Sequence, residues 1–176
     1  TGVLRPELHA ELKAKAIDAG LYAANMPADV GGAGLDTLTW VLYEKELGKT
    51  GYALHYNCVG RPSNILCACE GEQRERYLFP SVRGERVDCL AMTEPGAGSD
   101  VRGMKTSAVE KGGDYVINGT KHFISHADHA DFVILFAATG EETGPRGTKK
   151  LITAFLVDKG TPGFEVRSGY KNVSHR

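Results

Sequence analysis

The sequence lacks the features that mark several large classes of protein. Its 176 residues contain no apolar run close to the roughly 20 residues that a transmembrane helix needs. The formal net charge is −1 at pH 7, so the strongly basic surface of a nucleic-acid-binding domain is absent. The N-terminal stretch TGVLRPELHAELK has no signal-peptide pattern. We therefore expect a cytoplasmic protein of one large or two small domains, with no membrane span and no nucleic-acid partner.

Nucleophilic and metal-binding patterns are also scarce. Four cysteines occur (Cys58, Cys67, Cys69 and Cys89), and no second pair stands at zinc-binding spacing from the C-x-C of Cys67 and Cys69. We expect these thiols to be reduced and buried, with the C-x-C pair in an apolar helix. There is no G-x-S-x-G elbow and no convincing pairing of a Ser or Cys with a His and an acid.

The stretch HADHAD, residues 126–131, is the one place where potential metal ligands gather. His126, Asp128, His129 and Asp131 all fall within it. No further ligand set follows at a recognised spacing, which zinc sites require. A solvated turn between strands is the favoured interpretation, and a metal site is the alternative.

Helical patterns dominate the first half of the chain. The stretch PELHAELKAKAIDAG, residues 6–20, begins with proline and ends with glycine, as helices often do. Asp36 is placed to cap a second helix, TLTWVLYEKELGK. Three more helical segments are predicted further on: YALHYNCV at 52–59, SNILCACEG at 63–71 and EQRERYLFPSVRG at 72–84.

Strand patterns take over after Gly84. The short apolar runs VDCLAMT, DFVILFAAT, KLITAFLVD and GFEVR predict strands, the middle two of them buried. Two more strand-like runs flank Asn118-Gly119, a dipeptide that favours a type I′ hairpin turn. The polar segment at 139–150 predicts an exposed hairpin loop. The predicted fold class is α+β, with a helical domain at 1–83 followed by an antiparallel, β-barrel-like domain at 84–176.

Two stretches of the second half have residues suited to a ligand. In PGAGSD, consecutive small residues would let backbone N–H groups and the Ser99 hydroxyl converge on a phosphate; a plain turn between strands is the alternative. In KHFIS, strand alternation would put Lys121, Phe123 and Ser125 on one face. A ring and a hydroxyl there could meet a flat, hydrogen-bonding ligand, whereas Phe123 could equally be a cross-strand aromatic of a β core.

Four stretches occur in one order along the chain: MPADVGGAGLD, AMTEPGAGSDVRGMKT, DYVINGTKHFISHADHADFVILFA and TPGFEVRSGYKNVSHR. Together they resemble the acyl-CoA dehydrogenase family of flavoenzymes along almost the whole length of the chain. The resemblance implies the family's N-terminal helical domain, with its first helix missing, and the family's middle β domain. It also implies FAD as the cofactor and a homotetramer acting in fatty acid metabolism.

The resemblance assigns most flavin contacts to the loop that follows the first strand. Backbone groups of Leu90 and Met92, together with Thr93, would meet the polar edge of the isoalloxazine. The Gly98 backbone and Ser99 would meet the pyrophosphate, and Ser99 would also contact the substrate. Hydrogen-bond donors at the ring would stabilise the negative charge that develops on reduction.

A second group of contacts falls in KHFIS. By the resemblance, Phe123 would pack on the flavin ring and Ser125 would hydrogen-bond near its N5 atom. The family often has Trp at the position of Phe123, and Tyr or Phe at that of Leu90, so the acyl specificity does not carry over. Glu94 and Asp100 are expected to hold the loop through hydrogen bonds to the backbone.

The resemblance implies α,β-dehydrogenation of an acyl-CoA thioester, with electron-transfer flavoprotein or a similar acceptor as the partner. The family's catalytic glutamate lies in a C-terminal helical domain, beyond the end of this sequence. No catalytic residue is therefore expected within these residues, which alone would be inactive. The alternatives are an acyl-CoA oxidase or flavin monooxygenase of the same fold, and a non-catalytic binding module.

Overall fold

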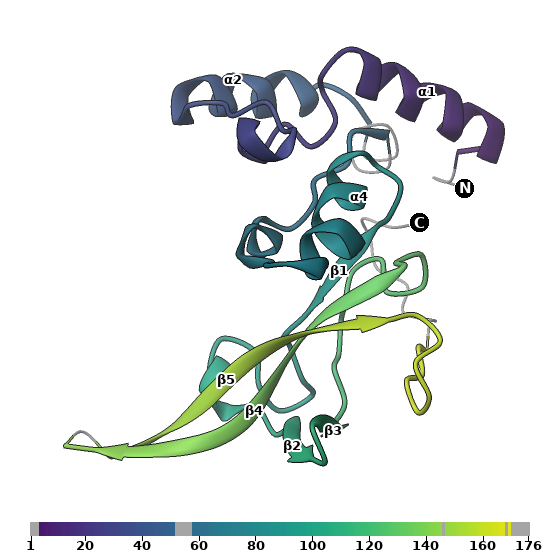
Figure 1. Cartoon of the computed structure of the whole chain (residues 1–176). Helices are drawn as coiled ribbons and strands as arrows, with labels where there is room; N and C mark the ends of the chain where they lie inside the picture. Colours follow the sequence, from purple (N-terminus) through teal and green to yellow (C-terminus); the bar gives the residue numbers. More distant parts are fainter. Residues whose placement is uncertain (1–3, 52–57, 146, 168, 170–176) are drawn as a thin grey trace. The chain divides into compact units, whose positions relative to one another are not determined.

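The computed structural model describes residues 4–51, 58–145, 147–167 and 169, so most of the helix predicted at 52–59 lies outside the described residues. The chain divides into two compact units, one on residues up to Val87 and one on Asp88–Tyr170 (Figure 1). Among the described residues, the first unit is helical and the second carries the sheet. The predicted α+β class is confirmed. No helix in the described part is long and apolar enough to cross a membrane.

The helical unit contains α1 (Pro6–Asp18), α2 (Thr37–Leu47) and α4 (Phe79–Val82). Pro6 opens α1, and Gly20 follows its end with φ at +67°, as the sequence predicted. The Asp36 carboxylate accepts a hydrogen bond from the Thr39 N–H at 2.9 Å, which confirms the predicted cap of α2. The segment at 63–71 forms only a 3₁₀ turn, Asn64–Ala68, and a π turn at Arg74–Leu78 leads into α4.

The glycine-rich loop between α1 and α2 folds tightly over Met26, whose side chain is completely buried. The Met26 carbonyl accepts a hydrogen bond from the Gly34 N–H at 3.0 Å. A Cβ added at Gly32 would lie 2.1 Å from that carbonyl oxygen. The motif therefore needs glycine at position 32 because another backbone segment occupies the space of a side chain.

The second unit is built on one open sheet of five strands: β1 (Asp88–Ala91), β2 (Ser107–Lys111), β3 (Asp114–Asn118), β4 (Phe132–Gly144) and β5 (Gly147–Asp158). The strand order is β1-β4-β2-β3, and β5 also pairs with β4. β1 and β2 each pair with β4 in parallel, whereas β2–β3 and β4–β5 are antiparallel. The sheet is therefore mixed, whereas a wholly antiparallel sheet was predicted.

The predicted hairpin turn at Asn118-Gly119 is wrong. β2 and β3 do form a hairpin, but they turn at Gly112-Gly113, where both residues have positive φ, +65° and +90°. Asn118 pairs with Ser107 at the far end of the same ladder. Gly119 serves a different purpose, because a Cβ there would lie 2.2 Å from the Thr106 hydroxyl oxygen.

β4 and β5 form a long twisted ribbon (Figure 1), and the loop predicted at 139–150 is part of it. The strands continue to Gly144 and Gly147, so that segment is exposed but largely paired. The first half of β4 is buried as predicted, whereas none of the described residues of β5 is buried. The strand predicted at 163–167 is also wrong, because these residues form no ladder.

A small apolar cluster on one face of β1 includes side chains of β1 itself, so neighbouring side chains of that strand face the other way. Its buried members are Cys89, Ala91, Ala130 and Val133, with Ile124, Ala127, Leu135 and Phe164 packed against them. Cys58 and Cys69 are buried as predicted, but Cys67 is exposed and lies in the 3₁₀ turn instead of an apolar helix. All four cysteines are free.

Candidate functional site

The end of β1 presents the first group of candidate flavin contacts. Strand alternation buries Cys89 and Ala91 in the apolar cluster and leaves Leu90 between them 41% exposed. Met92 and Thr93 follow at half-buried positions. The Leu90 side chain therefore lies on the face of β1 opposite the cluster.

The loop after β1 is closed by a pair of backbone hydrogen bonds. The Glu94 N–H donates to the Ala97 carbonyl at 2.9 Å, and the Ala97 N–H donates to the Glu94 carbonyl at 3.2 Å. Pro95 and Gly96 form the tip between them. Gly98 and Ser99 follow at exposed positions, so their backbone and hydroxyl groups are accessible to a ligand. Their predicted contact with a pyrophosphate stays a prediction.

A buried ion pair lies directly behind this loop. The Glu94 carboxylate accepts hydrogen bonds from the backbone N–H of Lys105 at 2.6 Å and of Thr106 at 3.0 Å. It also pairs with the Lys121 ammonium at 2.8 Å, and the two side chains are only 5% and 8% exposed. The same ammonium donates to the Met92 carbonyl at 3.0 Å. Glu94 has the structural role predicted for it, through hydrogen bonds to the backbone, but these bonds reach residues 105 and 106 and not the turn at 94–97. Its partner Lys121 was not predicted.

The pKa of the Glu94 carboxyl lies well below its ordinary value. Burial raises the pKa of this carboxyl, but the hydrogen bonds from Lys105, Lys121 and Thr106 together outweigh burial and lower its pKa to about 2. A lowered folded-state pKa stabilises the fold fully above the unfolded value near 4.5 and loses that contribution as the pH falls toward 2.

We therefore expect acid to destabilise the protein through Glu94 in one defined pH window. Urea unfolding midpoints measured between pH 6 and roughly pH 2 should fall more steeply for the native chain than for Glu94→Gln, which has no carboxyl to protonate. The two curves should differ most in slope below the unfolded-state pKa of 4.5. Parallel curves through that window would show that the Glu94 charge does not stabilise the fold.

The segment that carries Phe123 and Ser125 is not a strand, so the predicted alternation is wrong. Phe123 has φ at +57°, a left-handed conformation that breaks any ladder. The His122 N–H donates to the Thr93 carbonyl at 2.8 Å, which holds this segment beside the loop after β1. Ile124 packs against the apolar cluster, and the residues on either side, Phe123 and Ser125, are exposed.

The structure thus brings two separate stretches of sequence into one surface. Phe123, 67% exposed, follows directly on the residue that bonds to Thr93. Its ring stacks on that of His122 with the centroids 3.8 Å apart. The result is an exposed aromatic ring beside Thr93, whose carbonyl accepts the His122 N–H and whose side chain carries a hydroxyl. A ring next to such a polar group suits a flat, hydrogen-bonding ligand.

The HADHAD stretch forms a turn, as favoured. The N–H groups of His129 and Ala130 both donate to the His126 carbonyl, at 3.0 and 2.9 Å. The exposed His129 and Asp128 side chains approach to 3.6 Å. Within the described residues, no three side chains of metal-binding type gather in one place.

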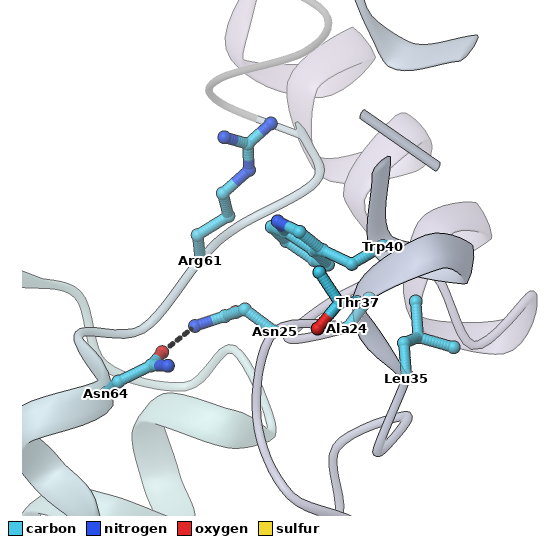
Figure 2. A pocket seen from close by; sticks show the side chains of 7 residues that line it. All are labelled: Ala24, Asn25, Leu35, Thr37, Trp40, Arg61 and Asn64. Atoms are coloured by element: carbon cyan, nitrogen blue, oxygen red, sulfur yellow. Dashed lines mark hydrogen bonds between the residues drawn. The ribbon is translucent and has the colours of Figure 1, made fainter. Parts of the chain in front are cut away.

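A cavity in the helical unit has a volume of about 350 Å³ and is lined by Ala24, Asn25, Leu35, Thr37, Trp40, Arg61 and Asn64 (Figure 2). Much of its polar lining is already engaged. The Asn25 amide nitrogen donates to the Pro62 carbonyl at 2.8 Å and to the Asn64 side chain. Arg61 pairs with Glu44 at 2.9 Å and lies over the Trp40 ring. These bonds join Asn25 to residues 62–64 and Arg61 to α2. In the described part of the chain, Asn25 Oδ1 and Glu44 Oε1 are buried and have no hydrogen-bond partner.

Two family profiles cover nearly the whole chain. The profile described as "Acyl-CoA dehydrogenase, N-terminal domain" matches residues 4–85, and "Acyl-CoA dehydrogenase, middle domain" matches residues 89–176. The helical unit and the sheet unit are therefore two successive domains of one kind of protein. The chain belongs to the acyl-CoA dehydrogenase family.

Individual relatives agree with this assignment. The chain is 40% identical over 165 residues to cyclohex-1-ene-1-carbonyl-CoA dehydrogenase of Geobacter metallireducens, which covers 91% of this chain and 41% of that protein. It is 36% identical over 163 residues to caffeyl-CoA reductase-Etf complex subunit CarC of Acetobacterium woodii, covering 89% and 41%. The chain thus spans about two fifths of the length of these curated relatives.

Solved structures give the same result. A probable acyl-CoA dehydrogenase from Mycobacterium abscessus matches with a TM-score of 0.76 and 33% identity, over 97% of this chain and 44% of that one. A glutaryl-CoA dehydrogenase from Mycobacterium smegmatis, solved in complex with FADH2, matches with a TM-score of 0.73 and 28% identity, over 98% and 42%.

Proposed function

We propose that this chain forms part of an FAD-dependent acyl-CoA dehydrogenase, which introduces a double bond between the α and β carbons of an acyl-CoA thioester. When bound, FAD would supply the acceptor for the hydride that leaves the β carbon. The observation that carries the proposal is the exposed ring of Phe123, held in a left-handed conformation beside Thr93. Membership in the family supports it.

The residues present fit a flavin. An isoalloxazine needs an apolar surface for its ring and hydrogen-bonding groups at its polar edge. Phe123 and Leu90 both expose apolar side chains, and Met92 and Thr93 follow Leu90 at half-buried positions. Their carbonyls accept bonds from Lys121 and His122, so their N–H groups and the Thr93 hydroxyl are the polar contacts proposed for the ring. The one acid of this loop that is buried, Glu94, is already bound to Lys121 and two backbone N–H groups, so its charge is compensated.

Each candidate residue has a proposed task. Phe123 would orient the ring by stacking and exclude water from one side of it. Backbone groups at Leu90 and Met92, with the Thr93 and Ser125 hydroxyls, would hold the polar atoms of the ring. Donors placed there favour the reduced form, because it carries more negative charge. These contacts, which also include Gly98 and Ser99 at the pyrophosphate and Ser99 at the substrate, complete the proposed site.

The remaining parts of the activity are proposed to lie outside this chain. A general base must remove the α proton, and none of the candidate flavin contacts has a side chain suited to that step. We propose electron-transfer flavoprotein as the electron acceptor, because one relative is named as a subunit of an Etf complex. A homotetramer is proposed on the family resemblance alone.

Substituting Phe123 tests the proposed flavin site directly. Phe123→Ala should weaken FAD binding by about tenfold, because ring stacking contributes on the order of 1 kcal/mol beyond the burial of area. Tyr115→Ala is the matched control, since Tyr115 is a 48% exposed aromatic of the same unit that lies on β3 and makes an edge contact with Phe155. FAD affinity is measured by quenching of flavin fluorescence in both variants.

The expected result is weaker binding for Phe123→Ala and native affinity for Tyr115→Ala. Equal affinity in the two variants would contradict the placement of the flavin on Phe123. In the complete protein encoded by the gene, anaerobic bleaching of bound flavin by an acyl-CoA, followed by slow reoxidation in air, supports a dehydrogenase. Rapid reoxidation in air would instead indicate an oxidase.

A further inference from the structure

Lys121 is buried at a point where nothing in the proposed chemistry requires a charge. Its ammonium is bonded to two acceptors on the loop after β1, the Glu94 carboxylate at 2.8 Å and the Met92 carbonyl at 3.0 Å. These acceptors lie 27 and 29 positions away in the sequence. The lysine therefore ties two distant segments together through one side chain.

The position of Phe123 depends on what holds its neighbours. A non-glycine residue in the left-handed conformation is disfavoured, because its Cβ lies too close to the backbone, so it persists only where adjacent contacts impose it. On one side of Phe123, the Lys121 side chain and the His122 N–H both bond to the loop after β1. On the other side, Ile124 packs against the apolar cluster. The exposed ring thus follows a segment bonded to the loop after β1 and precedes a residue packed in the apolar cluster.

We propose that Lys121 is a positioning residue for the flavin, which sets the place and orientation of Phe123 by tying its segment to Met92 and Glu94. This inference rests on the proposed function for its ligand. The tie itself is a property of the protein without flavin. Lys121 acts through the segment it anchors and not by contact with the reacting atoms.

The presence of a charged pair, Glu94 and Lys121, supports a role in placing the segment that carries Phe123. A buried ion pair is often no more stabilising than apolar side chains of the same volume, because both charges lose their hydration. An apolar side chain at position 121, however, could not bond to the Met92 carbonyl or to the Glu94 carboxylate. Only a long donor reaches both, so the pair fixes the register between the two segments in a way that packing alone does not.

The first experiment follows the His122 amide by hydrogen exchange in flavin-free protein. Lys121→Met should speed its exchange by at least about tenfold, while amides in the middle of β4 keep native rates. Lys150→Met is the matched control, because the Lys150 ammonium also bonds to a backbone carbonyl, that of Met104 at 2.6 Å, in the same unit. That variant should leave the exchange of the His122 amide unchanged.

The second experiment measures the bound flavin in the complete protein encoded by the gene. Lys121→Met should weaken FAD binding by about tenfold and change the visible circular dichroism of the flavin, which reports the asymmetry of its surroundings. Lys121→Arg, which keeps the charge and the donors, should restore part of both signals. Lys150→Met should keep the native affinity and spectrum even where it lowers the unfolding midpoint.

Should Lys121→Met fail to fold, the double variant Glu94→Gln with Lys121→Met removes both charges and leaves no buried charge unpaired. The same results are expected of it. Native exchange at the His122 amide, or a native flavin spectrum, in a folded variant that lacks the lysine would overturn the positioning role. If the complete protein without any substitution binds no FAD, the proposed function is refuted. The exchange experiment would still decide whether Lys121 holds the segment that carries Phe123.

Discussion

Glu94→Ala is expected to destabilise the sheet unit by about 3–5 kcal/mol, the largest effect that the structure predicts for a single side chain. The change leaves the Lys121 ammonium buried without its counter-charge. It also removes the acceptor of the Lys105 and Thr106 N–H groups, and a buried donor left without its acceptor costs stability. A loss of this size is a large fraction of the stability of an ordinary domain. Urea unfolding followed by circular dichroism measures it.

Glu142→Ala is the control for this prediction. Glu142 pairs with Lys149 at 2.7 Å, a distance similar to that of the buried pair, but the two side chains are 57% and 53% exposed. Exposed pairs contribute about 0–1 kcal/mol, since water solvates both charges when the pair is broken. Comparable losses in the two variants would mean that burial of Glu94 and its backbone hydrogen bonds do not matter.

Gly32→Ala is expected to destabilise the helical unit by about 3 kcal/mol, at the upper end of the range for overpacking. The added methyl group would lie 2.1 Å from the Met26 carbonyl oxygen and 2.4 Å from its carbon. These are backbone atoms, so the conflict cannot be relieved by turning a side chain. The unfolding midpoint in urea should fall, with loss of the helical circular dichroism as the readout.

Gly51→Ala provides the comparison within the same unit. A Cβ at Gly51 meets no atom of the described residues within 4 Å, so its unfolding midpoint should stay close to that of the native chain. Native stability in Gly32→Ala would show that the loop can shift away from Met26. The glycine-rich motif would then need another explanation.

The helices were the part of the fold most readily predicted from sequence, because their signals are local. Pro6 and Gly20 bracket α1, and Asp36 bonds to a backbone group only three residues away. Such caps act within a single turn, so the sequence alone contains the whole interaction. The strands β1 and β4 were also located correctly, since their apolar runs are buried in the cluster beneath them.

The wrong predictions concern choices that distant contacts decide. Both Asn118-Gly119 and Gly112-Gly113 can adopt positive φ, and local preference favoured the former pair. In the structure the ladder turns at Gly112-Gly113, and Gly119 instead lies close to Thr106, just before β2. Such an approach between segments 13 positions apart has no local signal. Likewise, KHFIS alternates like a strand, but the ties of Lys121 and His122 to the loop after β1 hold Phe123 in a left-handed conformation.

The candidate site was predicted in part for the same reason. Glu94 was expected to hold its turn through backbone hydrogen bonds. Its carboxylate does bond to backbone N–H groups, but those of Lys105 and Thr106, 11 and 12 positions on. Its pairing with Lys121 spans 27 positions and has no local signature. Which residues contact flavin stays a prediction, made from the family resemblance and supported by the exposure of Leu90, Phe123 and Ser125.

The visible absorption spectrum of the purified protein encoded by the complete gene, recorded before anything is added, tests the central claim most directly. The account predicts the two-banded spectrum of protein-bound flavin, in an amount that approaches one FAD per chain. A colourless protein that also fails to bind added FAD would contradict the assignment of the face around Phe123 as a flavin site. The chain would then keep the family fold without its cofactor, as a binding module would.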